Sequence, residues 1–226
     1  MAATFDEAVR YYGMKRWDLA LQMFHSVDAS ALTAEEKTNL AYYLGLCYTK
    51  LERYNDAAVY LEQVVTGEAG ALRVCQCRLT LAYIYMVTSR PRLAEFELDR
   101  LLKSGFRSVQ IYTMTAYAAF MQKNNDRALK MYETALAIDP NNATAMNGLG
   151  FLLVESGKDL RRGLELCKKA VEKSPHNAAY LDSLGWAHYK AGEFIEARQW
   201  LRRALDLAPR QKDISSHMKT LVAEAS

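Results

Sequence analysis

The sequence has few glycine, proline and cysteine residues, and it contains no long apolar run. Only 11 Gly and 4 Pro occur in 226 residues, while half of the residues are hydrophobic and 24% are charged. This composition is typical of a soluble, helix-rich chain that forms a core. Because no stretch of 18 apolar residues occurs, we expect no membrane-spanning helix.

The four cysteines show none of the spacings that metal-ligating cysteines have. We therefore expect Cys47, Cys75, Cys77 and Cys167 to be small buried side chains, which favours a reducing compartment. The first seven residues lack the basic start and apolar segment of a signal peptide. The sequence thus favours a cytoplasmic location, and a periplasmic location stays open if a leader has been removed.

Sequence motifs for catalysis are also missing. Gly148-Leu149-Gly150 lies inside an expected helix and has no third glycine, so it is no phosphate-binding loop. Neither a His-Glu-x-x-His motif nor a Gly-x-Ser-x-Gly motif occurs. Asp182, Ser183 and His188 lie on one expected helix and cannot converge as a triad. We expect no enzyme activity, no cofactor and no metal.

What the sequence does contain is a repeat. Pro140, Pro175 and Pro209 are separated by 35 and 34 residues, and small residues recur in phase with them. One set of small residues comprises Ala82, Ala116, Gly150 and Gly185; a second comprises Ala94, Ala128, Gly163 and Ala197; a third comprises Ala135, Ala170 and Ala204. A period of about 34 residues indicates stacked helix–turn–helix units. The small residues allow the two helices of each unit to approach closely.

This unit resembles the tetratricopeptide repeat (TPR), and the run Leu-Asp-Ser-Leu-Gly-Trp-Ala at 181–187 is similar to bacterial members of that family. The resemblance implies an all-α, right-handed superhelix (an α-solenoid) of about six helix–turn–helix units. The expected units are about 1–37, 38–74, 75–108, 109–142, 143–177 and 178–211, with one extra residue near Lys158–Leu160. We expect Gly157, Gly192 and the pair Asn124–Asn125 to supply turns.

The two ends of the array differ from its middle. In the first unit the places that would contact a preceding unit are Ala3, Glu7 and Arg10, a polar set. Residues 212–226 continue the apolar phase with Ile214, Met218 and Leu221 but place Ser215 and Lys219 where a further helix would pack. We therefore expect 212–226 to be a C-terminal capping helix and the array to be complete.

In the tetratricopeptide-repeat family, the first helix of each unit lines the concave face. Here that stripe is rich in aromatic residues and methionine, which is the composition of a recognition surface. The candidate partner-binding residues are Tyr42, Leu79, Tyr83, Met86, Tyr117, Phe120, Met121, Asn147, Phe151, Asp182, Trp186 and Tyr189. Stacking of adjacent first helices would bury some of them. Asn147 suits a peptide backbone and Asp182 a cationic group, although both also suit a solvated groove.

These features predict a non-enzymatic scaffold or adaptor that binds an apolar or amphipathic peptide segment of another protein in its concave groove. Two alternatives stay open: a carrier of a small apolar ligand in the same groove, and a self-assembling structural subunit that forms a homo-oligomer. The basic residues near Arg161, Arg162, Lys168 and Lys169 fit a solvated outer face with pairs such as Glu165–Lys169, or an acidic partner. A pI of about 8.6 without an aromatic-basic platform argues against nucleic acid.

Overall fold

The computed structural model describes residues 5–67 and 69–224. Ala3, the other first residues of the first expected repeat and the last two residues of the expected C-terminal helix lie outside this described part. Helices and turns make up the described residues, and no strand occurs among them, which confirms the all-α class predicted from the sequence. Glu7 and Arg10, expected on a polar face, are exposed on the first helix.

The helices group into two compact units, of which the first ends at Phe106 and the second begins at Arg107. We call them the N-terminal and the C-terminal unit. The N-terminal unit contains α1 (Phe5–Gly13), α2 (Trp17–His25), the short helix η1 (Ala29–Ala31), α3 (Ala34–Lys50), α4 (Tyr54–Thr66), α5 (Ala71–Val87) and α6 (Pro91–Lys103). The C-terminal unit contains α7 (Val109–Met121), α8 (Asn125–Ile138), α9 (Ala143–Glu155), α10 (Leu160–Lys173), α11 (Ala178–Lys190), α12 (Phe194–Leu207) and α13 (Lys212–Glu224).

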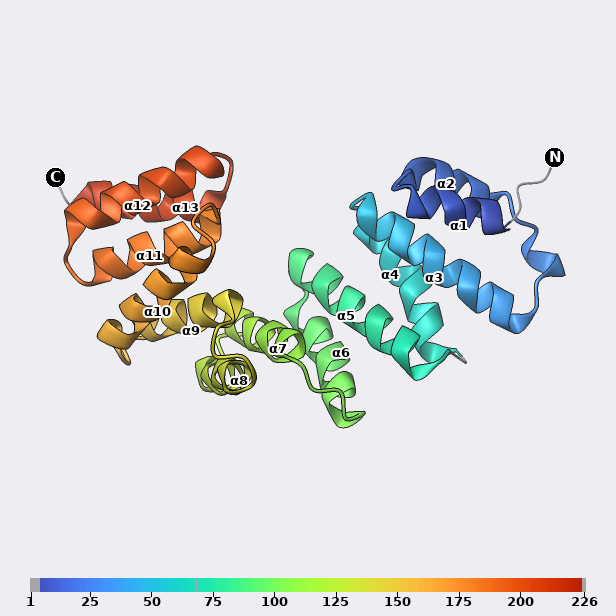
Figure 1. The fold of residues 1–226 in the computed structure, drawn as a ribbon, viewed down its shortest axis with the longest axis horizontal. Helices are drawn as coiled ribbons and strands as arrows, with labels where there is room; N and C mark the ends of the chain where they lie inside the picture. The colour runs from blue at the N-terminus through green and yellow to red at the C-terminus, as the bar shows by residue number, and fades with distance from the viewer. Residues whose placement is uncertain (1–4, 68, 225–226) are drawn as a thin grey trace. The chain divides into compact units, whose positions relative to one another are not determined.

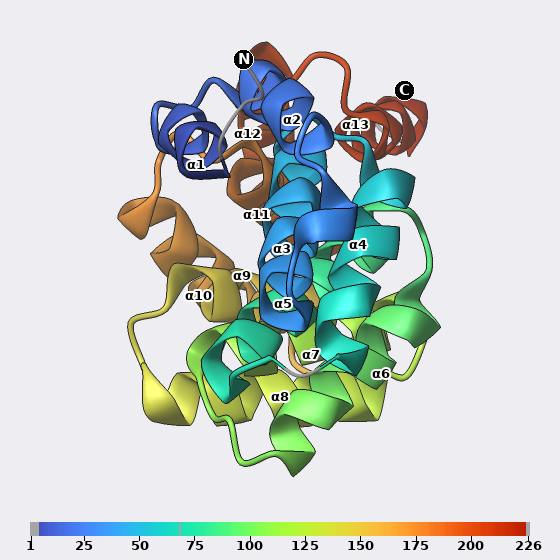
Figure 2. The same ribbon diagram turned by 90° about the vertical axis from the view of Figure 1, so that its right-hand side faces the viewer.

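Within each unit, consecutive helices pack in pairs. In the N-terminal unit α1 packs on α2, α3 on α4, and α5 on α6, and Figure 2 shows α3 and α4 side by side. In the C-terminal unit α7 pairs with α8, α9 with α10, and α11 with α12. The first helices of neighbouring pairs also touch, so that α7, α9, α11 and α13 form one layer. We propose that each pair is one repeat with the boundaries expected from the sequence.

Small residues bring the paired helices together, as the sequence predicted. Ala82, Ala94, Ala116, Ala128 and Ala197 have no exposed surface. At Gly150 and Gly163 the backbones of α9 and α10 lie so close that a Cβ atom on either glycine would come within 2.8 Å of the carbonyl oxygen of the other. No side chain fits between these two helices at this point.

The turns inside the pairs repeat one backbone geometry. In the three-residue turns the middle residue has a positive φ: Lys15, Glu52, Ser89, Lys123 and Gly192. The turn between α9 and α10 is one residue longer, as the sequence predicted, and Gly157 has the positive φ there. The prediction for Asn124–Asn125 is right for Asn124, which lies in the turn, and wrong for Asn125, which is the first residue of α8. Lys123 takes the left-handed conformation, whereas the Asn124 side chain accepts a hydrogen bond from the Arg127 backbone N–H and caps α8.

The C-terminal helix α13 covers the end of the last helix pair. Figure 1 shows it beside α12, and it also contacts α11. Ile214 and Leu221 are almost completely buried, and Met218 packs against Leu201, Ala197 and Leu221. Helix α13 therefore belongs to the core of the C-terminal unit.

The cysteines behave as the sequence predicted. All four are buried, and none forms a disulfide. Burial raises the pKa of Cys47, Cys77 and Cys167 to about 12, so these side chains stay protonated at neutral pH. They are small hydrophobic core residues rather than reactive thiols.

Candidate functional site

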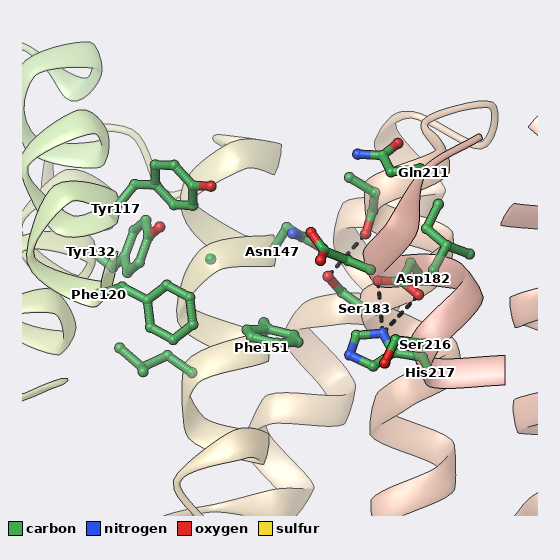
Figure 3. Close-up of a pocket in the computed structure, with 15 residues that line it drawn as sticks. Tyr117, Phe120, Tyr132, Asn147, Phe151, Asp182, Ser183, Gln211, Ser216 and His217 are labelled. Atoms are coloured by element: carbon green, nitrogen blue, oxygen red, sulfur yellow. Dashed lines mark hydrogen bonds and ion pairs between the residues drawn. The ribbon is translucent and has the colours of Figure 1, made fainter. Parts of the chain in front are cut away.

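A cavity of about 490 Å³ opens in the C-terminal unit. Its walls come from α7, α8, α9, α11 and α13, together with Gln211, which directly precedes α13. Figure 3 shows the rings of Tyr117, Phe120 and Tyr132 on one side, and the polar side chains of Asp182 and His217 on the other. Asn147 and Phe151 lie between the two sides. Five of the twelve predicted site residues line this cavity: Tyr117, Phe120, Asn147, Phe151 and Asp182.

The aromatic side chains of this unit form an unbroken run from α7 to α11. The ring centroids of Tyr117 and Phe120 are 6.5 Å apart, and those of Phe120 and Phe151 are 5.8 Å apart at an interplanar angle of 89°. The Phe151 ring lies 6.4 Å from the His217 ring, which stacks on Trp186 at 4.1 Å. Trp186 in turn stacks on Tyr189 at 4.7 Å. Such pairs stabilise one another, so the rings form a continuous aromatic wall.

Asp182 is held by a histidine from α13. The Nδ1 atom of His217 lies 2.9 and 3.0 Å from the two carboxylate oxygens of Asp182. Because an ionised carboxylate only accepts hydrogen bonds, Nδ1 is the donor. The Asp182 residue is 7% exposed, so this carboxylate is a buried polar group at the bottom of the cavity and not a solvated one, as one interpretation of the sequence had it. The contact links α11 to α13.

Asn147 has an unused acceptor. Its Oδ1 atom is buried and has no hydrogen-bond partner in the described part of the chain. A buried carbonyl oxygen without a donor costs about 1–3 kcal/mol. Since Asn147 lines the cavity, a molecule placed there can supply the missing donor.

A neighbouring glycine gives Tyr132 its place in the wall. The Tyr132 ring from α8 lies where a side chain on residue 148 would be: a Cβ atom there would come within 2.2 Å of Cζ. Burial raises the pKa of the Tyr132 hydroxyl above its ordinary value, so the phenol stays neutral. Gly148 thus allows an aromatic ring from a second helix to reach the cavity.

Three predicted residues of the C-terminal unit lie outside the cavity lining. Met121 is partly buried at the end of α7. Trp186 is only 8% exposed, because His217 and Tyr189 cover it, and its Nε1–H donates to Glu155 at 2.7 Å. Trp186 is therefore mainly a packing residue that supports the wall. The Tyr189 hydroxyl bonds to Glu224 of α13, which raises its pKa.

The N-terminal unit holds the other four predicted residues. Tyr83 is 44% exposed and makes an edge contact with Tyr54 at 6.2 Å. Leu79 and Met86 are partly buried. The Tyr42 hydroxyl donates to Gln76 at 2.7 Å, and Arg73 lies 5.0 Å from the Tyr42 ring. The role of these four residues in binding stays a prediction.

Sequence reasoning missed His217, Tyr132, Ser183 and Gln211 as cavity residues. A signal existed for His217. It follows Asp182 by 35 residues, one repeat period, so the inner stripe extended by one period ends on it. We found no comparable signal for Tyr132, because it belongs to a second helix and reaches the cavity only through the gap at Gly148.

On the basic outer face, Arg161 and Arg162 pair with carboxylates. Arg162 lies 3.2 Å from Glu133, and Lys158 lies 2.6 Å from Asp126. Glu165 pairs with Arg161 at 3.6 Å and not with Lys169, the partner that the sequence suggested. Exposed pairs of this kind contribute little to stability. They support a solvated face.

Residues 5–67 and 69–224 contain neither a helix suited to cross a membrane nor a cluster of metal-binding side chains. None of the helices there is both long and apolar enough to cross a membrane. The same residues contain no group of three or more His, Cys, Asp or Glu side chains that could hold a metal ion.

Three segments of the chain match models of one repeat family. Residues 116–157 match a model described as TPR repeat, and residues 178–211 and 40–66 match models described as Tetratricopeptide repeat. The matched segments cover α3 with α4, α7 to α9, and α11 with α12 in whole or in part. The chain is a tetratricopeptide-repeat protein, as its residues suggested.

The chain is also similar to two longer proteins and to a solved structure. The chain is 26% identical to the human Protein O-mannosyl-transferase TMTC1 over 84% of its own length and 22% of that protein. It is 26% identical to the human Mitochondrial import receptor subunit TOM70 over 62% of its own length and 23% of that protein. The chain thus spans less than a quarter of these relatives. The structure of the APC/C hetero-tetramer Cut9-Hcn1 has the same fold, with a TM-score of 0.74, 13% identity, and coverage of 96% of this chain and 42% of that one.

Proposed function

We propose that this chain is a non-enzymatic protein-interaction scaffold, and that the cavity of its C-terminal unit binds an apolar or amphipathic peptide segment of a partner protein. The observation that carries this proposal is the aromatic wall, which shares its cavity with a buried amide oxygen without a donor. Rings of this kind are the side chains that dominate binding energies at protein interfaces.

Peptide chemistry fits both parts of the cavity. An apolar side chain of a partner can cover the rings of Phe120 and Phe151, and a backbone N–H of the same segment can donate to Oδ1 of Asn147. Tyr117 is 47% exposed, so it can extend the contact beyond the cavity. A peptide supplies apolar groups and N–H donors at regular spacing, whereas a purely apolar small ligand would leave the acceptor unpaired.

The comparisons support a binding role without identifying a partner. TOM70 is, by its name, an import receptor subunit, and a receptor acts by binding other molecules. TMTC1 is by its name a transferase, but the chain spans 22% of it, so we carry no activity over. The proposal of a non-enzymatic chain rests on the missing catalytic motifs in the sequence. The cytoplasmic location also stays a prediction.

Removing two rings from the wall tests the proposal. Random 12-residue peptides displayed on phage would be selected on the immobilised full chain, and the affinity of a selected peptide measured by fluorescence polarisation. We expect Phe120→Ala with Phe151→Ala to weaken binding, because each hot-spot ring contributes about 1–4 kcal/mol. Helicity measured by circular dichroism should stay close to that of the unchanged chain.

The matched control removes exposed apolar side chains of the same unit that lie outside the cavity. Ile138 and Ile195 are 51% and 73% exposed and lie outside the cavity, so Ile138→Ala with Ile195→Ala should leave the affinity unchanged. Tyr117→Ala provides a second groove variant at an exposed position. If selected peptides bind the folded double phenylalanine variant as tightly as the original chain, the cavity is not their site.

Native mass spectrometry of the purified protein tests the two alternatives, a carrier of a small apolar ligand and a self-assembling subunit. A bound small ligand adds its own mass, and self-assembly multiplies the mass of the chain.

A further inference from the structure

The walls of the C-terminal cavity differ in charge from the unit around them. Residues 107–226 contain 17 Lys and Arg but only 13 Asp and Glu. The cavity lining, in contrast, includes Asp182 and Asp213 but neither Lys nor Arg among the described residues. Its only other ionisable groups are Tyr117, Tyr132 and His217. The cavity is therefore an acceptor-rich site with two carboxylates, one of them bonded to His217, in a basic unit.

Acceptors on one side of the cavity face aromatic rings on the other. Oδ1 of Asn147 lacks a donor, and Asp182 bonds to His217 through Nδ1 alone, which leaves further lone pairs on its carboxylate. Across the cavity from Asp182, Phe120 meets Phe151 edge to face at 5.8 Å, and the two rings form a corner. A cation placed between ring faces and carboxylates is attracted by both.

We propose that this cavity takes the arginine side chain of the partner segment, an inference that rests on the proposed function. A guanidinium group has five N–H donors in one plane and stacks on aromatic rings. In the cavity it would donate to the carboxylates of Asp182 and Asp213, its apolar stem would cover Phe120 and Phe151, and Asn147 Oδ1 would accept from the adjoining backbone N–H. A volume of about 490 Å³ accommodates such a side chain with part of the adjoining backbone.

Arginine matches this site better than the other candidate occupants. A lysine ammonium carries the same charge but cannot stack as a plane, and an apolar side chain satisfies none of the acceptors. A carboxylate would meet Asp182 and Asp213 and be repelled. The charge of the cavity thus selects for a basic residue flanked by apolar ones.

Two small probes that differ only in charge test this inference. Acetyl-arginine amide and acetyl-citrulline amide have nearly the same shape, but citrulline is neutral. In titrations of the full chain followed by two-dimensional NMR, we expect the arginine probe to shift the side-chain amide of Asn147 and backbone amides of α9 and α13. It should bind about tenfold more tightly than the citrulline probe, or more. Equal affinities would overturn the inference.

Variants locate the effect on the cavity. Asp213 is exposed, so Asp213→Asn should keep the fold and weaken binding of the arginine probe about threefold or more, with little change for citrulline. The matched control is Asp206→Asn, which removes an exposed carboxylate of α12 outside the cavity and should change neither affinity. Identical effects of both variants would also contradict the inference. If the charge of the probe makes no difference while selected peptides still depend on Phe120 and Phe151, the proposed function stands and only the arginine assignment fails.

Discussion

Replacing Ile214 and Leu221 of α13 by alanine is expected to lower the melting temperature by on the order of 10 °C and to promote aggregation. Both side chains are buried, Ile214 at 1% and Leu221 at 0% exposure, and they pack on α11 and α12. Loss of a buried aliphatic side chain costs about 2–5 kcal/mol, and the C-terminal helix pair has no other cover in the described residues. Circular dichroism during heating and size-exclusion chromatography measure both effects.

Deleting 212–226 should have the same effect in a stronger form, because it also removes His217 from Asp182 and Trp186. Lys219→Ala, at an exposed position of the same helix, is the matched control and should shift the melting temperature by little. A truncated chain that melts at the original temperature as a monomer would show that α13 is a dispensable tail.

The second large effect is expected at the crossing of α9 and α10. Gly150→Ala would place Cβ 2.8 Å from the carbonyl oxygen of Gly163 and 3.0 Å from the backbone nitrogen of Cys167. Backbone atoms of a helix cannot turn away as a side chain can, so the two helices must separate. We expect a loss of about 2–3 kcal/mol in the free energy of unfolding, measured with a chemical denaturant.

Gly148→Ala is the matched control, two residues away on the same helix. There the new Cβ meets the outer atoms of the Tyr132 side chain, which lines the cavity, and no backbone atom is among the nearest ones. This variant should lose clearly less stability than Gly150→Ala but should weaken peptide binding, because the displaced ring fills part of the site. If both variants are equally stable, contact between the backbones does not limit how closely α9 and α10 approach.

The fold could be predicted from the sequence because its contacts are local and periodic. Small residues recur about every 34 positions, and each sets a close approach between helices that are neighbours in the chain. The burial of the cysteines followed from their spacing and apolar surroundings. The conformation of Lys123 could not be predicted in this way, since a non-glycine residue carries no sign of a positive φ.

By itself, then, the sequence determined the repeat, the helix pairs and the aromatic stripe of the first helices. Only the tertiary structure decided which of the stripe residues share a cavity, because that depends on side chains contributed by other helices. His217 of α13 covers Trp186 and holds Asp182. Both were predicted to contact a partner, but Trp186 supports the wall and Asp182 is a buried acceptor. The Tyr132 ring lines the cavity because Gly148 has no side chain in the space that the ring occupies. A helical period fixes the direction of each side chain along its own helix, whereas the neighbouring helices fix what covers it.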